Sequence, residues 1–202
     1  MSQVALRQAS VYGCALIARR AMKHADTLPP ILAFLEEIGL ACSPGEVAAD
    51  TFLPGVVIRD GALCYDSARL SSPGDLLHEA GHLAAVPACW RGQIQGDVDA
   101  SLVALADVYP DAAGIVHTDL FPIAWSFAAA RHIGIDPACI FDAGGYGAQS
   151  GGDPAILASQ LEAGLFPGIA MLANAGLCAA PPPFGDGLDP APYPQMKRWL
   201  TA

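Results

Sequence analysis

The sequence predicts an α+β fold: a single, mostly helical domain over residues 1–202 with a small β-hairpin or sheet beside a central helix. Apolar residues recur with helical spacing in several segments, and two short β-prone runs flank a turn. No internal repeat or change of composition divides the chain. A length of 202 residues suits one domain that buries a sizeable core.

Composition and charge exclude several classes of protein and partner. The chain has 20 Asp and Glu residues against 10 Lys and Arg, a net charge of −10, and 53% of its residues are hydrophobic. Only 15% are charged, which argues against a disordered chain or a coiled coil. A nucleic acid or an anionic membrane surface requires a positive field, so we expect neither as the main partner.

The chain also lacks the sequence features of a membrane or exported protein. Its apolar stretches are far shorter than the roughly 20 residues of a spanning helix, and we recognise no signal peptide near its start. Its six cysteines are scattered, without the close pairs typical of zinc ribbons or redox motifs. We therefore expect a cytoplasmic protein whose cysteines are mostly buried thiols rather than disulfides.

Local signals predict the elements of the first half of the chain. Helices are expected over residues 2–24 and 30–40, and a hairpin over residues 55–65, because Asp60-Gly61 tolerates the positive φ of a tight turn. A further helix is expected from residues 72–73 to about residue 86. Its start combines a serine cap, a proline in the first turn and Asp75 in a capping-box-like position.

Similar signals predict the second half. Helices are expected over residues 97–108, 119–133 and 154–164, with a short strand or extended segment at residues 138–141. Small and aromatic residues in the helix over 119–133 suit close packing against the helix before it. From about residue 167 the proline and glycine content rises, which predicts an irregular C-terminal tail.

One motif in the helix over residues 72–86 carries most of the chemistry: His78-Glu79-Ala80-Gly81-His82. Residues four apart lie on one face of a helix, so His78 and His82 can direct ring nitrogens at one metal ion. Glu79 lies about 100° round the helix, beside the ion, where a general base is needed. The motif therefore predicts a Zn²⁺ site that activates water for hydrolysis.

This stretch resembles the zincin metallopeptidases, whose signature is H-E-x-x-H on an active-site helix. The order of helix, hairpin, motif helix and further helix is most similar to the minimal gluzincins and the ImmA/IrrE-type regulatory peptidases. The resemblance covers about residues 50–135. It implies a strand beside the cleft where a peptide substrate could pair. The extended metzincin motif is excluded, because Ala85 and Ala88 replace its glycine and histidine.

The third metal ligand is less sharply defined by the sequence. Gluzincins take a carboxylate from a following helix, which makes Asp119 the first candidate, although it could equally cap that helix. His117, His132 and Glu162 follow as candidates, in that order. An aspartate here departs from the gluzincin glutamate. Tyr146 is the candidate oxyanion stabiliser, with His117 or His132 as alternatives if they are not ligands; for each of these residues ordinary packing or exposure remains open.

These features predict a zinc-dependent hydrolase, specifically a metallopeptidase that acts on a peptide or protein. The acidic surface would suit cationic peptides. One alternative is a metal-binding regulatory module without turnover, although the presence of Glu79 favours an enzyme. Another is a helical interaction domain in which the motif is coincidental, which would bind no metal.

Overall fold

Helices dominate the fold, and one three-stranded sheet lies beside them, which confirms the predicted α+β class. The computed structural model describes residues 26–115, 118–142, 145–149 and 153–202. The helix predicted over residues 2–24 lies outside this part of the chain. The next helix covers residues 26–37, so it includes residues ahead of Pro30, where its start was predicted.

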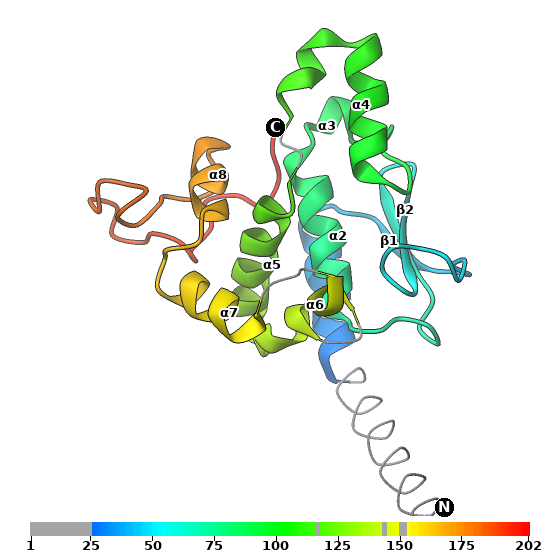
Figure 1. Cartoon of the computed structure of the whole chain (residues 1–202), viewed down its shortest axis with the longest axis horizontal. Helices are drawn as coiled ribbons and strands as arrows, with labels where there is room; N and C mark the ends of the chain where they lie inside the picture. The colour runs from blue at the N-terminus through cyan, green and yellow to red at the C-terminus, as the bar shows by residue number, and fades with distance from the viewer. Residues whose placement is uncertain (1–25, 116–117, 143–144, 150–152) are drawn as a thin grey trace, which may run out of the picture.

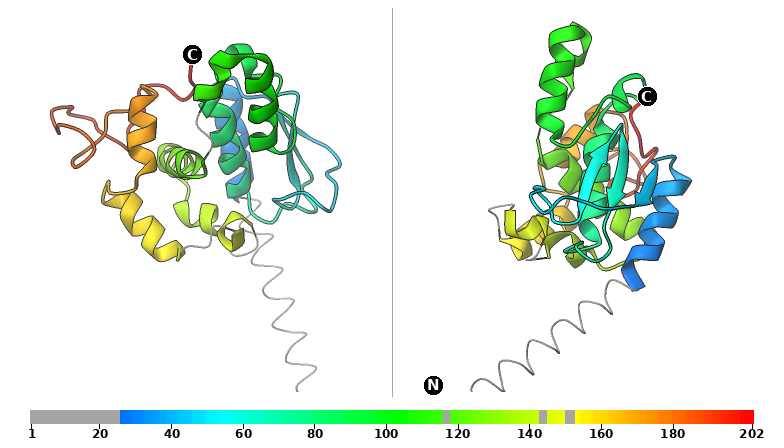
Figure 2. Two further views of the ribbon diagram at one scale, coloured as in Figure 1. Left: turned by 45° about the horizontal axis from the view of Figure 1, so that its top comes forward. Right: turned by 90° about the vertical axis from the view of Figure 1, so that its right-hand side faces the viewer.

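The elements are arranged around helix α2 (Gly74–Ala85), which carries the motif. Figure 1 shows the sheet on one side of α2 and helix α5 (Leu120–Ile133) on the other. The left view of Figure 2 shows helices α7 (Pro154–Glu162) and α8 (Gly168–Asn174) on the side of α5 that faces away from α2. The motif helix therefore lies between the sheet and helices α5, α7 and α8.

The sheet contains the predicted hairpin and one further strand. Strands β2 (Val56–Arg59) and β3 (Ala62–Tyr65) pair antiparallel, and Asp60 and Gly61 at their turn have φ values of 50° and 71°. Strand β1 (Cys42–Pro44), which the sequence analysis did not predict, pairs parallel with β3. The strand order is β1-β3-β2, so β2 forms an edge of the sheet.

The start of α2 follows the predicted capping pattern. The Ser72 hydroxyl accepts a hydrogen bond from the Gly74 N–H at 3.3 Å, and the Asp75 carboxylate accepts one from the Ser72 N–H at 3.2 Å. The helix ends at Ala85, where Val86 adopts an extended conformation ahead of Pro87. Local sequence signals therefore determine both ends of the motif helix.

Two predictions for the second half of the chain were wrong. Residues Pro137–Phe141 form a 3₁₀ helix, η2, rather than a strand, because the Asp136 carboxylate accepts from the Ala138 N–H at 2.9 Å and starts a helical turn. Helix α8 lies inside the segment predicted to be irregular from about residue 167. The remaining elements are α4 (Val98–Val108) and three short ones, α3 (Ala88–Arg91), η1 (Pro110–Gly114) and α6 (Tyr146–Gln149).

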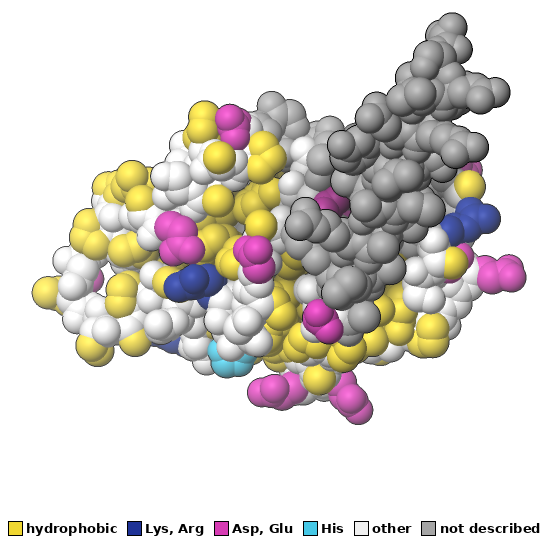
Figure 3. Space-filling view, turned by 90° about the horizontal axis from the view of Figure 1, so that it is seen from below, with side chains coloured by type: hydrophobic (Ala, Val, Ile, Leu, Met, Phe, Trp, Pro, Cys, Tyr) yellow, Lys and Arg dark blue, Asp and Glu magenta, His cyan; other side chains and the backbone are white. Residues whose placement is uncertain are grey.

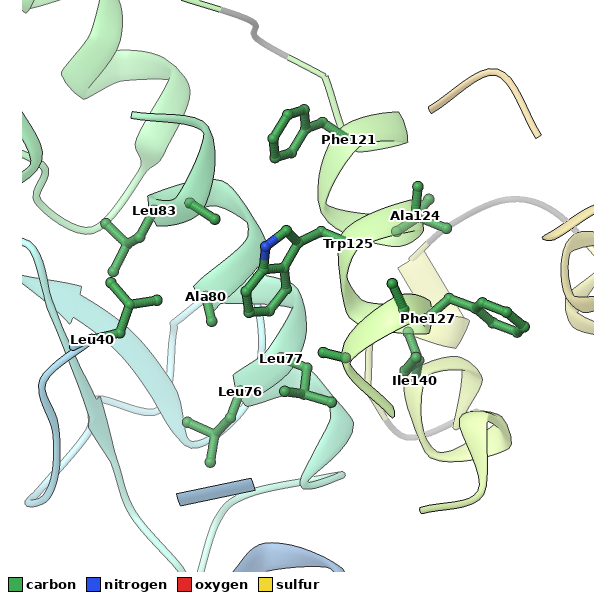
Figure 4. Close-up of a cluster of buried hydrophobic side chains, with 14 of the residues drawn as sticks. Leu40, Leu76, Leu77, Ala80, Leu83, Phe121, Ala124, Trp125, Phe127 and Ile140 are labelled. Carbon is green, nitrogen blue, oxygen red and sulfur yellow. The ribbon is translucent and has the colours of Figure 1, made fainter. Parts of the chain in front are cut away.

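The contact between α2 and α5 forms the centre of the hydrophobic core. Figure 4 shows Trp125 extending from α5 toward leucine and alanine side chains of α2. Trp125 is fully buried, and its indole N–H donates to the Trp199 carbonyl at 2.8 Å. Gly81 faces Pro122, and a Cβ added at Gly81 would lie 2.6 Å from the Pro122 Cα. The glycine therefore permits the two helices to approach closely.

Figure 3 shows acidic side chains spread over the lower face with hydrophobic side chains between them. Cys64 and Cys178 are buried, whereas Cys89 is exposed, so the expectation of mostly buried cysteines is only partly met; none of the five described cysteines forms a disulfide. Within the described residues, no helix is both long enough and apolar enough to cross a membrane.

Candidate metal centre

The structure brings His78, His82 and Asp119 together as a group that could hold a metal ion, and we call these three residues the metal group. The two histidines lie one turn apart on α2, and Asp119 immediately precedes α5. Their Nε2 atoms are 3.2 Å apart, and the Asp119 Oδ1 lies 3.6 Å from His78 Nε2 and 3.3 Å from His82 Nε2. In the described part of the chain, it is the only group of three or more His, Cys, Asp or Glu side chains with this arrangement.

The spacing of these three atoms fits a coordinated ion. Ligand atoms about 2.0–2.1 Å from a tetrahedral zinc ion lie roughly 3.3–3.4 Å from one another. The observed separations of 3.2, 3.3 and 3.6 Å bracket that value. A hydrogen bond between an imidazole and a carboxylate is normally about 2.7–3.2 Å long, so both contacts of Asp119 are too long for good hydrogen bonds.

Asp119 has a geometry that separates its two predicted roles. Its side chain makes no capping hydrogen bond at the start of α5. The neighbouring Thr118 hydroxyl instead accepts from the Leu120 N–H at 3.3 Å. The Asp119 carboxylate is therefore available to the histidines, and the structure favours the ligand role that the sequence left open.

Burial and the mutual contacts of the three groups set their ionisation. Burial lowers the pKa of His78 to about 4, so its imidazole is neutral near pH 7. Burial also lowers the pKa of His82, but the Asp119 and Glu79 carboxylates outweigh that effect and raise it. The two histidines hold the pKa of Asp119 well below its usual range. A neutral imidazole and an ionised carboxylate are the forms that bind a metal.

Glu79 opens onto the same cleft as His82 and Asp119. Burial, with a further contribution from the carboxylates of Asp75 and Asp119, raises the pKa of Glu79 to about 7, although His82 opposes the shift. A carboxylate with a pKa near the working pH is suited to exchange protons. The structure thus places the predicted base beside the predicted ligands, within reach of the same space.

The cleft has a volume of about 480 Å³, within the range of about 300–1,000 Å³ that is common for small-molecule sites. Val56 and Val57 of the edge strand β2 line one side of it. Its charged side chains are acidic, and none of the described lining residues is Lys or Arg. The acidic lining residues are Asp50, Glu79, Asp97, Asp99 and Asp119.

The other candidates for the third ligand do not join this group in the described structure. His132 packs against the rings of Phe34 and Trp199, with ring centroids 5.8 and 5.1 Å away. Glu162 is exposed and pairs with Arg131 at 3.6 Å. His117 lies outside the described residues. Of the three candidates within the described residues, Asp119 is therefore the one that the structure brings to the histidines.

Tyr146 lies behind the metal group rather than in the cleft. It is buried, its ring stacks on that of His78 with centroids 3.7 Å apart, and it is not among the described residues that line the cleft. Burial and the nearby Asp119 carboxylate raise the pKa of its phenol. These contacts favour an influence on the ligands over direct contact with a substrate.

Sequence reasoning missed three contributions to the site. Asp75 was interpreted only as a helix cap, although its carboxylate also accepts from the Tyr146 N–H at 2.9 Å. Gly81 was treated only as part of the motif, although it allows α5 to approach. Asp97 and Asp99 were not proposed as site residues, but they line the cleft. The sequence indicated Asp75 as part of a helix cap, but it gave no sign of its bond to Tyr146.

Comparisons with protein-family models, curated proteins and solved structures found no match to this chain. The resemblance to zincins therefore depends on the five-residue motif and the order of elements around it.

Proposed function

We propose that this chain is a zinc-dependent hydrolase, specifically a metallopeptidase. The observation that carries the proposal is the combination of three ligand atoms at tetrahedral spacing with a carboxylate, Glu79, that opens onto the same cleft. His78, His82 and Asp119 would hold the ion. Two imidazoles and one carboxylate, with a position left open, are a ligand set known from catalytic zinc sites.

The chemistry divides between the ion and the protein. When bound, zinc supplies Lewis-acid chemistry that makes water a nucleophile near neutral pH and polarises a carbonyl group. Glu79 accepts the proton of the attacking water and delivers it to the leaving amine, a role that its position on the same cleft suits. His78 is neutral and buried, so its ring offers a nitrogen lone pair without first losing a proton.

The edge of the sheet offers a surface on which a peptide could bind. Strand β2 is an edge strand, and Val56 and Val57 line the cleft beside the metal group. The Ile58 carbonyl already accepts from the Gly96 N–H at 2.8 Å, and the Val56 N–H donates to the Leu53 carbonyl at 3.4 Å, so a bound peptide would use the remaining backbone groups at the Val56 end of the strand. An extended peptide that pairs there would pass the carboxylate of Glu79.

The experiment that tests this proposal is hydrolysis of a peptide mixture by the full chain loaded with zinc, followed by mass spectrometry. Glu79→Gln serves as the control, because it keeps the three ligands and removes the base. We expect cleavage by the wild type and a loss of about 10²–10⁴-fold in the variant, which still binds zinc. A wild type that binds zinc but cleaves no peptide would contradict the peptidase and favour the regulatory module.

A further inference from the structure

Asp75 is a buried carboxylate that joins two distant parts of the chain. It lies in the first turn of α2 and is 0% exposed. One oxygen accepts from the Ser72 N–H at 3.2 Å, and the other accepts from the Tyr146 N–H at 2.9 Å. Gly145 packs so closely on this carboxylate that an added Cβ would collide with both of its oxygens. We refer to this arrangement of Asp75, Gly145 and Tyr146 as the Asp75–Tyr146 contact.

Helix capping alone does not explain this burial. Asp97, Asp136 and Asp153 each accept one backbone N–H at the start of a helix while they remain exposed. Moving a carboxylate out of water is costly unless hydrogen bonds compensate for it. Asp75 differs from these three caps in its burial and in its second bond, which reaches a residue 71 positions away. The second bond therefore indicates a further role.

The residue that Asp75 holds makes direct contact with the metal group. The Tyr146 ring stacks on the His78 ring at 3.7 Å, with an angle of 21° between the planes. The Asp119 carboxylate lies close enough to the phenol to raise its pKa. Histidines that bind metals usually donate their second ring nitrogen to a carboxylate or a carbonyl, which orients the ring. His78 Nδ1 is buried and has no hydrogen-bond partner among the described residues.

We propose that Asp75 is a positioning residue that orients the metal ligand His78 through Tyr146. The carboxylate holds the backbone of residues 145–146 against the start of α2, and the Tyr146 ring then keeps the His78 ring in the plane that directs Nε2 toward His82 and Asp119. This inference rests on the proposed metal site. It also gives Tyr146 a different task from the oxyanion stabiliser that the sequence suggested.

Three variants separate this role from capping. Asp75→Asn keeps the shape but cannot accept from both N–H groups, because its amide nitrogen is a donor. Tyr146→Leu removes the stacked ring, and Tyr146→Phe keeps the ring but removes the hydroxyl. Asp153→Ala is the matched control, because it removes a cap at the start of α7 and leaves the metal group untouched.

The first measurement uses the metal-free protein. A stacked phenol ring shifts the proton resonances of the imidazole beneath it, so we expect the His78 resonances to move in Asp75→Asn and Tyr146→Leu, and to stay in Asp153→Ala. Hydrogen exchange of the Tyr146 amide is expected to accelerate in Asp75→Asn, since its acceptor is weakened. Unchanged His78 resonances and unchanged exchange in Asp75→Asn would overturn the proposal.

The second measurement is zinc affinity by competition with a chromophoric chelator. We expect Asp75→Asn and Tyr146→Leu each to weaken binding by about 10–100-fold, the range found for partners of metal ligands. The double variant should be no weaker than Tyr146→Leu, and Tyr146→Phe, which keeps the stacked ring, should weaken binding less than Tyr146→Leu does. If Asp75→Asn lowers only thermal stability, as Asp153→Ala does, Asp75 is a cap and nothing more. A wild type that binds no zinc would refute the proposed function, whereas the metal-free measurements would still decide the role of Asp75.

Discussion

Replacement of Gly81 by alanine is expected to weaken the metal site by separating α2 from α5. A Cβ at this position would lie 2.6 Å from the Pro122 Cα and 2.7 Å from its Cβ. Carbon atoms in contact normally lie about 3.5–4.0 Å apart, so the helices would have to separate by about 1 Å. The Pro122 Cα belongs to the backbone, so no change of rotamer can relieve the contact.

The displacement would reach the metal group because Asp119 lies one turn before Pro122 at the start of the same helix. The Asp119 Oδ1 lies 3.3 Å from His82 Nε2 and 3.6 Å from His78 Nε2. A shift of about 1 Å would move this oxygen well beyond the roughly 3.3–3.4 Å that separates ligand atoms in a tetrahedral site. We expect Gly81→Ala to weaken zinc binding by at least about 10-fold.

Gly81→Ala is expected to bring no gain in the free energy of unfolding, unlike a glycine-to-alanine change on an exposed helix face. In a helix without close neighbours, alanine is more favourable than glycine by about 0.8–1.0 kcal/mol. Here overpacking costs about 1–3 kcal/mol, so we expect the variant to be no more stable than the wild type. Urea unfolding and chelator competition measure the two quantities.

A matched control is Gly92→Ala. Gly92 has a φ of −66°, which suits alanine, and an added Cβ would meet nothing within 4 Å. The control should bind zinc as the wild type does. A Gly81→Ala variant that gains stability and keeps wild-type zinc affinity would refute the close approach of α2 and α5 as the cause of the Asp119 position.

Three further predictions follow from the site. Thr118→Ala should lower the free energy of unfolding by about 1 kcal/mol and leave zinc affinity unchanged, whereas Asp119→Ala should abolish zinc binding. Urea unfolding measures the first quantity and chelator competition the second. An equal loss of zinc affinity in both variants would contradict the separate roles. Zinc affinity should fall by about tenfold per pH unit below the raised pKa of His82, because the proton and the ion compete for its imidazole. The buried His78 takes up a second proton only near its pKa of about 4. A zinc affinity that stays constant from about pH 8 to 5 would refute this competition. Peptides with Lys or Arg should be cleaved with higher kcat/KM than Glu-containing analogues, and Asp99→Asn should reduce the ratio of these two kcat/KM values. An unchanged ratio would show that Asp99 does not contribute to substrate specificity.

Local signals predicted the elements that carry the site. The capping pattern before α2, the Asp60-Gly61 turn and the helix that follows Thr118 each depend on residues close in sequence, and the structure contains all three. The prediction of an extended segment at residues 138–141 was wrong, because Asp136 starts a 3₁₀ turn there. The Asp136-Pro137 pair is a local signal for such a turn, and the β-prone residues that follow it outweighed it in the prediction.

Contacts between distant residues could not be predicted in the same way. The sequence left Asp119 with two roles, and only the distances to His78 and His82 favour one of them. The bond from Tyr146 to Asp75 spans 71 positions, and the contact of Gly81 with Pro122 depends on how two helices pack. Such contacts arise from the tertiary fold rather than from local propensity, so the residues that orient the ligands were found only in the structure.

Metal content tests whether His78, His82 and Asp119 hold a zinc ion. Plasma mass spectrometry of the purified wild type, His78→Ala and His82→Ala would give the identity and amount of bound metal. We predict about one zinc ion per wild-type chain and its loss in both variants. A wild type that contains no metal, and that gains no thermal stability when zinc is added, would contradict the account.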